Sequence, residues 1–366
     1  MRRSLGLPCV VLLAACAALA SCSELRRSSV AGAAAEEPGA EEEGEEGGGG
    51  GAKDGGASAP RDAGTDDGDA KPPACDGPCP PELLGGIYSV GSSMSAIAVD
   101  DENVYFATEG TTRVYQCPKT GCVGGPILLG EGAAYTIVVV SGRVYWADFS
   151  SGKILSCAVG GCGGQPTTVV ASQPSIRDLS TDEANLVWST SAANGAVRWC
   201  AIGATCTAAD VITNVGSVRT VAVHQGAALW SSSTTKGIRT CALGSCSSPK
   251  TLGPGGVDVS ARAGHAFWID NEITDSIVSC NAAGCGGSPK VIGTSPIPAS
   301  PASDATHVYW RDEGDRRIYR CPTSGCTPGG EIIARSQRCP AGVSLALDSS
   351  FVYWTTDDEV YRMPKP

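Results

Sequence analysis

One short hydrophobic triplet that ends in an aromatic residue recurs seven times along the chain. Successive triplets lie 40, 42, 42, 38, 42 and 44 residues apart. This period is typical of the four-stranded blades of β-propellers, and helical repeats of similar length are the alternative. The triplets end at Phe106, Trp146, Trp188, Trp230, Trp268, Trp310 and Trp354.

The residues around the triplets favour strands over helices. They form short β-branched or aromatic runs bounded by Gly, Ser, Asp and Pro, and they lack the i, i+3, i+4, i+7 spacing of helices. With 48 Gly and 23 Pro in 366 residues, long helices have little room. We label the strands of each unit A to D. In the first unit they are expected at 95–100, 104–108, 113–117 and 126–130.

The two ends of the repeat region complement each other. The last unit ends after its strand C, whereas the segment 75–86 resembles the end of other units. If this segment supplies the missing strand D, the ring closes and no edge is left exposed. We therefore expect an all-β propeller over 75–366, with seven four-stranded blades closed by an N-terminal strand. Six or eight blades are the alternatives.

Residues 1–22 have the pattern of a bacterial secretion signal. Arg2 and Arg3 precede an apolar run that ends in Leu19-Ala20-Ser21-Cys22. This ending resembles the lipobox of bacterial lipoproteins, which implies that Cys22 is the lipid attachment site. Cys16 also fits the pattern, and an ordinary signal peptide cut near Ala20 is a third option. With Ser23 following the cysteine, the resemblance implies a lipid anchor in the outer membrane, with the domain in the periplasm or exposed at the surface.

Residues 23–74 are expected to form a disordered tether. The stretch 23–72 holds 13 acidic and 5 basic side chains and nothing aromatic, so ordering it would bury too little apolar surface. It accounts for −8 of the net charge of −11, which leaves the folded domain only mildly acidic. We expect a monomer, and nucleic-acid binding is improbable for an acidic exported chain.

Six units carry a cysteine pair after strand C. In an exported protein, disulfides are the first expectation, and each would bridge the arms of the hairpin between strands C and D. Structural zinc needs four ligands, and pairs on separate blades do not converge. Glycines before the second cysteine, such as Gly121 and Gly284, predict a positive φ there. The pairs are Cys117/Cys122, Cys157/Cys162, Cys200/Cys206, Cys241/Cys246, Cys280/Cys285 and Cys321/Cys326.

The seventh unit departs from this rule, because Met363 takes the place of the first cysteine. Cys75, Cys79 and Cys339 remain for one bridge and one free thiol. A bridge between Cys75 and Cys79 is the simplest pairing, and Cys339 paired with either of them is the alternative.

Three triplets are followed by Asp, giving YWAD (145–148), FWID (267–270) and YWRD (309–312). They resemble the YWTD repeats of propellers of the low-density-lipoprotein-receptor type. The resemblance implies strand B aromatics packed between blades and structural turns at the three Asp residues. Those propellers, however, have six blades and no cysteine pair in each. The lipobox, tether and cysteine-marked blades together resemble uncharacterised secreted lipoproteins of bacteria.

The loops between strands B and C are rich in carboxylates. Such a ring could bind Ca²⁺, a basic peptide or a polyamine, and Asp148, Asp270, Asp312 and Asp357 are the candidate ligand-binding residues. Solvated loops with turn-forming Asp are the alternative. No cofactor other than Ca²⁺ is expected. The carboxylates are Glu109, Asp148, Asp270, Glu272, Asp275, Asp312, Glu313, Asp315, Asp357 and Asp358.

The three histidines, His224, His265 and His307, are expected near A–B turns on the opposite face, so no Ser/His/Asp set can be assembled. We therefore expect a lipid-anchored, non-catalytic binding or scaffold module of the cell envelope, with a protein, peptide or glycan as ligand. The alternative is a metal-dependent propeller hydrolase or lyase that uses loop carboxylates.

Overall fold

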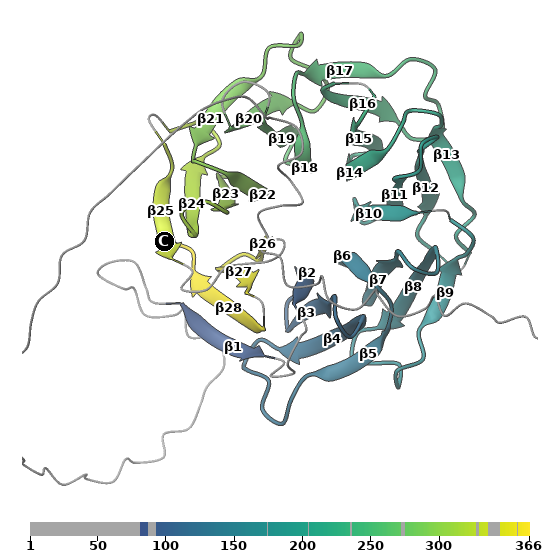
Figure 1. The fold of residues 1–366 in the computed structure, drawn as a ribbon, viewed down its shortest axis with the longest axis vertical. Coiled ribbons are helices and arrows are strands. Elements are labelled where there is room, and N and C mark those ends of the chain that lie inside the picture. The colour runs from purple at the N-terminus through teal and green to yellow at the C-terminus, as the bar shows by residue number, and fades with distance from the viewer. Residues whose placement is uncertain are drawn as a thin grey trace, which may run out of the picture. The chain divides into compact units, whose positions relative to one another are not determined.

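The computed structural model describes residues 81–86, 93–173, 175–203, 205–234, 236–271, 275–326, 329–335, 345–356 and 358–366. These residues fold into seven antiparallel sheets of four strands, which stand as blades around a central opening (Figure 1). The prediction of an all-β propeller with seven four-stranded blades is therefore confirmed. Among the same residues, no apolar helix of membrane-spanning length occurs.

In six blades the four strands follow one another along the chain, from the innermost strand A to the outermost strand D. Blade 1 has β2 (Met94–Val99), β3 (Asn103–Thr108), β4 (Arg113–Pro118) and β5 (Ile127–Glu131); blade 2 has β6 (Ala134–Val140), β7 (Arg143–Asp148), β8 (Lys153–Ala158) and β9 (Thr167–Val170); blade 3 has β10 (Ile176–Thr181), β11 (Asn185–Thr190), β12 (Val197–Ala201) and β13 (Ala209–Ile212); blade 4 has β14 (Val218–His224), β15 (Ala227–Ser232), β16 (Ile238–Ala242) and β17 (Lys250–Gly253); blade 5 has β18 (Val257–Arg262), β19 (His265–Asp270), β20 (Ser276–Asn281) and β21 (Lys290–Thr294); blade 6 has β22 (Pro298–Ser303), β23 (His307–Asp312), β24 (Arg317–Pro322) and β25 (Glu331–Arg335).

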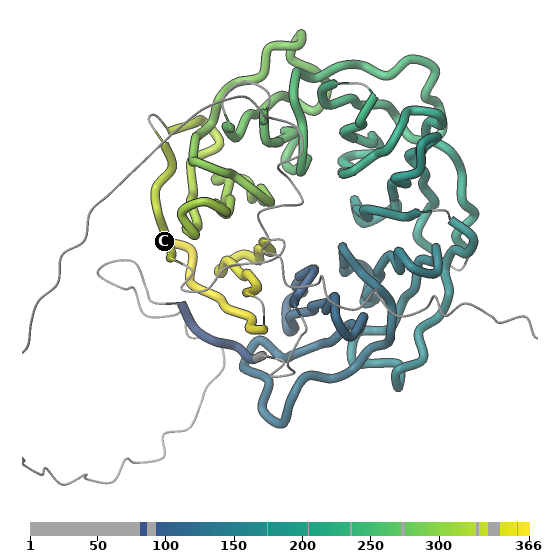
Figure 2. Tube along the Cα trace, in the orientation of Figure 1, coloured from purple at the N-terminus to yellow at the C-terminus, as the bar shows by residue number. Residues whose placement is uncertain are grey.

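Blade 7 is built from both ends of the described chain. Its first three strands are β26 (Leu345–Leu347), β27 (Phe351–Thr355) and β28 (Glu359–Pro364), and its outermost strand is β1 (Glu82–Gly86). β1 pairs antiparallel with β28, so the earliest and latest strands lie side by side in Figure 2. The predicted N-terminal closing strand is thus confirmed.

The core lies between neighbouring blades, where the aromatic residues of the triplets pack. The six Trp side chains of the triplets and Phe106 are at most 2% exposed. One cluster joins Ala96 and Tyr105 of blade 1 to Val144 and Trp146 of blade 2. Because side chains alternate along a strand, each inner strand contributes one face to each of two seams, which explains why both faces are apolar.

The outer strands carry glycine where the next blade's Trp ring needs space. A Cβ on Gly130 in β5 would lie 2.9 Å from Pro166 and 3.2 Å from Cζ2 of Trp146, both in blade 2. The same arrangement recurs between Gly253 and Trp268. Glycine in a strand interior often marks such a close approach.

All six predicted disulfides are present, with Cα–Cα distances of 5.2 to 5.6 Å. Gly121 and Gly284, which precede the second cysteine of their pairs, have φ of +116° and +128°, so the predicted positive φ is confirmed. The bonded pairs are Cys117–Cys122, Cys157–Cys162, Cys200–Cys206, Cys241–Cys246, Cys280–Cys285 and Cys321–Cys326.

The position of the second cysteine corrects the expectation that each bridge joins the two arms of the C–D hairpin. The pairing of strands C and D ends at the residue before the first cysteine, as at Thr240 with Lys250. Beyond that point the chain forms a loop, and the second cysteine lies in this loop, half-buried, instead of in strand D. Each bridge therefore ties the C–D loop to the end of strand C. The correction applies to Cys122, Cys162, Cys206, Cys246, Cys285 and Cys326.

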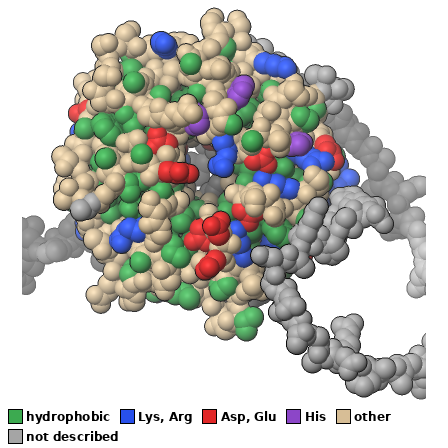
Figure 3. Space-filling model, turned by 180° about the vertical axis from the view of Figure 1, so that it is seen from behind, with side chains coloured by type: hydrophobic (Ala, Val, Ile, Leu, Met, Phe, Trp, Pro, Cys, Tyr) green, Lys and Arg blue, Asp and Glu red, His purple; other side chains and the backbone are tan. Residues whose placement is uncertain are grey.

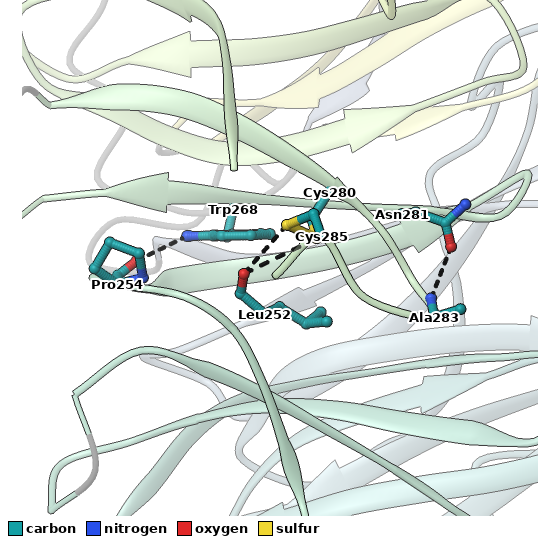
Figure 4. Close-up of a disulfide and its surroundings, with 7 residues drawn as sticks. All are labelled: Leu252, Pro254, Trp268, Cys280, Asn281, Ala283 and Cys285. Carbon is teal, nitrogen blue, oxygen red and sulfur yellow. Dashed lines mark hydrogen bonds between the residues drawn. A yellow bond between two sulfur atoms is a disulfide. The ribbon is translucent and has the colours of Figure 1, made fainter. Parts of the chain in front are cut away.

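The disulfide loops pack on the outer strand of the preceding blade. In Figure 4, Sγ of Cys285 lies 3.3 Å from the carbonyl oxygen of Leu252, which belongs to β17 of blade 4. The backbone N–H of Cys326 donates to the carbonyl of Ile292 in β21 of blade 5 (2.9 Å). At the closing blade, the N–H of Cys122 donates to the carbonyl of Leu84 in β1 (3.0 Å). These loops therefore cover strand edges that would otherwise be exposed.

Several predictions concern residues outside the described part of the chain. They are those made for Cys16, Cys22, Cys75, Cys79, Cys339, Glu272 and Asp357.

Candidate functional site

Three of the candidate aspartates, Asp148, Asp270 and Asp312, end strand B and are buried. Asp312 is fully buried, and its carboxylate accepts hydrogen bonds from the backbone N–H groups of Ile297 (2.6 Å), Gly314 (2.9 Å) and Asp315 (2.8 Å). Asp270 is 6% exposed, and a Cβ on Gly255 would lie 2.5 Å from its Oδ1. These side chains join the D–A connection to the rest of the blade.

Asp148 occupies the equivalent position in blade 2. It accepts hydrogen bonds from the backbone N–H of Ala133 (3.1 Å) and from the backbone N–H (3.1 Å) and hydroxyl (2.7 Å) of Ser150, as well as from the hydroxyl of Ser151. Burial acts to raise the pKa of Asp148, but these hydrogen bonds outweigh it and hold the pKa below its usual range. The carboxylate is therefore ionised and engaged by its own turn and by the D–A connection.

The histidines lie at A–B turns, as expected. His224 ends β14, and His265 and His307 begin β19 and β23. Nε2 of His224 accepts a hydrogen bond from the backbone N–H of Gly264 (2.9 Å). Within the described residues, no group of three or more His, Cys, Asp or Glu side chains could hold a metal ion.

A ring of polar side chains that the sequence analysis missed links successive innermost strands. Four of them lie ten residues before a Trp, a periodicity that could have revealed them. The links are Ser95 Oγ to Ala134 O (2.6 Å), Thr136 Oγ1 to Leu179 O (3.2 Å), Val221 N to Asp178 Oδ2 (2.8 Å), Val259 N to Thr220 Oγ1 (3.4 Å) and Ser300 N to Asp258 Oδ2 (3.2 Å).

Asp178 is the most perturbed carboxyl of this ring. Burial raises its pKa to about 6, and the negative charge of Asp258 acts in the same direction. Backbone N–H groups of Leu179 and Val221 oppose the shift. The side chain therefore changes its charge at a mildly acidic pH.

On the A–B face, three turns share an Asp followed five residues later by the Tyr of the triplet. Asp348 shows the arrangement in full. Its Oδ1 accepts hydrogen bonds from the backbone N–H groups of Ser350 (2.7 Å) and Phe351 (2.6 Å), and its Oδ2 accepts one from the Tyr353 hydroxyl (2.6 Å). The three pairs are Asp100/Tyr105, Asp304/Tyr309 and Asp348/Tyr353.

Two of these pairs receive a lysine from the next blade. Nζ of Lys119 donates to Oδ2 of Asp348 (2.5 Å) and lies 5.2 Å from the centre of the Tyr353 ring. Nζ of Lys365 donates to Oδ2 of Asp304 (2.7 Å) and lies 5.5 Å from the Tyr309 ring. The ammonium thus sits between a carboxylate and an aromatic face, both of which attract it.

The lysines lower the pKa of their aspartates. Burial acts to raise the pKa of Asp348, but the hydrogen bonds from Lys119, Tyr353 and the backbone outweigh it, so the pKa lies below the usual range. Burial likewise acts to raise the pKa of Asp304, but hydrogen bonds from Lys365, from the backbone N–H groups of Thr306 and His307 and from the Thr306 hydroxyl hold it well below its usual range.

The lysines occupy an equivalent position in their blades, directly after strand C. There the backbone N–H donates to the A–B turn of the same blade in all seven cases, so the main chain is alike and only the side chain differs. The bonds are Lys119 to Glu102 (2.8 Å), Val159 to Gly142 (3.0 Å), Ile202 to Ala184 (2.8 Å), Leu243 to Gly226 (2.8 Å), Ala282 to Gly264 (2.9 Å), Thr323 to Thr306 (2.8 Å) and Lys365 to Ser350 (2.7 Å).

At the third Asp–Tyr pair, no lysine among the described residues binds the aspartate. Asp100 accepts the same three hydrogen bonds as Asp348, from the backbone N–H groups of Glu102 (2.9 Å) and Asn103 (2.7 Å) and from the Tyr105 hydroxyl (2.6 Å). The position that holds lysine at the other two seams is Val159 in blade 2.

A pocket of about 580 Å³ opens at this seam. Valines supply its apolar part and carboxylates its polar part. In Figure 3, which shows the face that carries the histidines, acidic side chains gather beside the central opening. The pocket, which we call the A–B pocket, is lined by Val99, Asp100, Asp101, Glu102, Val139, Val140, Ser141, Gly142, Val159 and Glu183.

No cation among the described residues pairs with the carboxylates of the A–B pocket. Asp101, Glu102 and Glu183 are exposed, and none of the ion pairs among the described residues involves them or Asp100. A low-dielectric wall of valines beside four carboxylates concentrates the negative potential there.

The chain matches no family model and no curated protein. Among solved structures it is similar to a streptogramin B lyase, at 11% identity with a TM-score of 0.63, over 77% of this chain and 96% of that one. A catalytically inactive virginiamycin B lyase from Staphylococcus aureus with quinupristin gives 10% identity and a TM-score of 0.63, over 78% and 99% of the two chains. The computationally designed Ika8 protein gives 10% and 0.55, over 77% and 99%. At these identities the similarity shows the fold, and the fold is a β-propeller.

Proposed function

We propose that this protein is a non-catalytic binding or scaffold module of the cell envelope, lipid-anchored through Cys22, and that the A–B pocket is its binding site. The single observation that carries the proposal is the pocket itself, with four carboxylates and an apolar wall at a seam whose two counterparts are closed. Ligand sites in proteins combine such apolar surface with a few placed polar groups.

The six disulfides support a location outside the cytoplasm, since such bonds persist in oxidising compartments. On this proposal, the signal-like residues 1–22 supply the anchor and the acidic stretch 23–74 serves as a spacer before the propeller. A module of this kind would present its pocket to partners at a distance from the membrane.

The anchor is tested by metabolic labelling with a lipid analogue in a bacterial host. We expect label on the full chain and on the Cys16→Ala variant, and none on Cys22→Ala. Label on Cys22→Ala would contradict the assignment of the attachment site.

The pocket is tested by photo-crosslinking in the same host. A photoreactive residue replaces Ser141 at the pocket, and the control variant carries it at Gly203, which lies in a C–D loop with open space around its Cα. Discrete adducts from position 141 that are absent from position 203 support the proposal. Identical patterns from both positions would contradict it.

Metal analysis and a thermal melt of the purified protein with and without EDTA distinguish the binding module from the alternative, a metal-dependent hydrolase or lyase. We expect an unchanged melting temperature. A stoichiometric divalent ion whose removal lowers that temperature would favour the hydrolase or lyase.

A further inference from the structure

The A–B pocket resembles a lysine site from which the lysine is missing. At two other seams the same Asp–Tyr pair holds an ammonium that the next blade supplies. At the seam between blades 1 and 2, Asp100 and Tyr105 are in place, but Val159 ends in methyl groups. The molecule therefore shows, within itself, what kind of group this arrangement binds.

We propose that the A–B pocket binds a primary alkylammonium group of a ligand, the side chain of a lysine in a partner protein, against Asp100 and Tyr105. This assignment of ligand chemistry rests on the proposed function of the pocket as a binding site.

The free acceptor position on Asp100 determines where the ammonium group of the ligand binds. Its Oδ1 is occupied by two backbone N–H groups and its Oδ2 by the Tyr105 hydroxyl. In Asp348, the same three bonds are present and Oδ2 accepts a fourth from Lys119. One further bond to Oδ2 is therefore available on Asp100, directed to the place where Nζ lies at the other seam.

This geometry favours lysine over arginine. A guanidinium binds carboxylates best through two parallel hydrogen bonds, one to each oxygen. Because Oδ1 of Asp100 is already occupied by two N–H donors, only a single bond to Oδ2 can form. A compact ammonium needs no more than that.

The other residues of the pocket complement the methylene stem of a lysine and the peptide residues that flank it. Val99, Val139 and Val159 offer apolar surface for the methylene stem. Asp101, Glu102 and Glu183 add negative charge around the entrance, where further basic residues of a peptide would lie. From the sequence, a basic peptide was one of several ligands considered for the carboxylates of the B–C face, whereas this site is on the A–B face.

The test uses the purified propeller-containing chain and three fluorescent peptides that are identical except for a central lysine, norleucine or arginine. Cadaverine serves as a small amine probe in a competition assay. We expect the lysine peptide to bind at least tenfold more tightly than the norleucine peptide, and binding to weaken with added salt. We expect cadaverine to compete only at concentrations above that of the peptide, which supports a protein lysine as the ligand. Competition at concentrations below that of the peptide would overturn the assignment to a protein lysine in favour of a free amine.

Val159→Lys is the decisive variant, because it leaves Asp100 intact and supplies the missing lysine from the protein itself. We expect it to weaken lysine-peptide binding at least tenfold. Ala282→Lys is the matched control, since it adds the same charge at the equivalent position of blade 5, which contributes no residue to the A–B pocket. We expect it to bind the peptide as the unaltered protein does.

Asp100→Asn should also weaken binding at least tenfold, with folding checked by the melting temperature. Equal binding of the lysine and norleucine peptides, or equal binding by Val159→Lys and Ala282→Lys, would overturn the inference. Crosslinks at the pocket without a lysine preference would reject this inference alone. Lysine-peptide binding without crosslinks in cells would reject the proposed function alone.

Discussion

The seam between blades 7 and 1 and the seam between blades 1 and 2 have nearly the same main chain. An ion pair closes the first, whereas the second opens into a pocket. At the first, Lys119 closes the seam by binding Asp348, and both side chains are under 20% exposed. At the second, Asp100 lies in an equivalent turn and accepts a hydrogen bond from an equivalent tyrosine, Tyr105, but Val159 takes the place of the lysine and a pocket remains. A single side chain after strand C thus determines whether a seam is a structural joint or an open site.

The two seams are alike at the level of the disulfide loop. At the first, the loop of Cys117–Cys122 packs on β1, the strand that closes the ring, through the hydrogen bond to Leu84. At the second, Sγ of Cys162 lies 3.1 Å from the carbonyl oxygen of Leu129. The contact between the disulfide loop and the outer strand of the preceding blade is therefore common to both seams, and the difference is confined to the A–B face.

The largest expected effect concerns the channel side of the seams, where Asp178 joins blade 3 to blade 4 and blades 2 and 4 use Thr at the same position. Since the folded pKa of Asp178 lies above its unfolded value of about 4, the folded state binds more protons between pH 4 and 6. The unfolding free energy should therefore fall by about 3 kcal/mol as pH rises through this window. In Asp178→Thr, urea denaturation at several pH values should show this contribution removed. An unchanged pH profile would contradict the assignment.

The second effect concerns the packing that both seams share. Gly130→Ala should destabilise the seam between blades 1 and 2 by about 2 kcal/mol, because its Cβ would overlap Pro166 and crowd Trp146. Gly203→Ala is the control, since a Cβ there meets nothing within 4 Å. Chemical denaturation of both variants measures the difference, and equal stabilities would show that the outer strand can shift to make room.

The third prediction concerns Lys119→Val, a variant that removes the lysine from the closed seam between blades 7 and 1. Lys119→Val leaves the carboxylate of Asp348 without its ammonium and should cost about 1–2 kcal/mol at pH 7, between the values for exposed and buried pairs. The lowered pKa of Asp348 gives a stability contribution that is present above pH 4 and is lost as pH falls further. The difference between the two proteins in thermal melts should thus shrink in acid. A constant difference would point to lost packing rather than lost charge pairing.

The smallest effect is expected for Val159→Lys, a variant that adds a lysine to the open seam between blades 1 and 2. Val159→Lys should raise the unfolding free energy by less than about 1 kcal/mol, since the ion pair forms at a partly exposed site. The gain should disappear in the double variant with Asp100→Asn, which a double-mutant cycle measures directly. A gain that survives in the double variant would mean that the new lysine does not reach Asp100.

Most of the fold was predictable because it depends on local periodicity. The triplets, their spacing and the turn residues predicted the strands of the first blade to within one residue at each end, and the incomplete last unit predicted the closing role of β1. The six disulfides followed from cysteine pairs whose first member lies 11 or 12 residues after the aromatic residue. These features repeat in every blade, so each copy reinforces the prediction made from the others.

The place of the second cysteine was not predictable in the same way. Cys206, Cys246 and Cys326 were expected in the second arm of the C–D hairpin, yet they lie in the loop before strand D. Where strand pairing stops depends on the register between strands C and D, which the spacing of cysteines along the chain does not specify.

The candidate site was less predictable than the fold. The aspartates at the ends of strand B were singled out by their charge, yet Asp148 and Asp312 accept hydrogen bonds from their own turns and from the D–A connection. The Asp–Tyr spacing and the lysines two residues after a cysteine or Met363 were visible in the sequence. Their pairing was not, because Lys119 and Asp348 are 229 residues apart.

The sequence by itself determined the blade, its number and its closure, since a repeated pattern of buried and turn residues has few ways to bury its apolar faces. Only the tertiary structure decided which blades meet, and therefore which turn of one blade faces which loop of the next. Electrostatic and hydrogen-bond complementarity across a seam depends on distances of a few ångströms between residues far apart in the chain. That is why Val159 is an unremarkable residue in the sequence and the wall of a pocket in the folded ring.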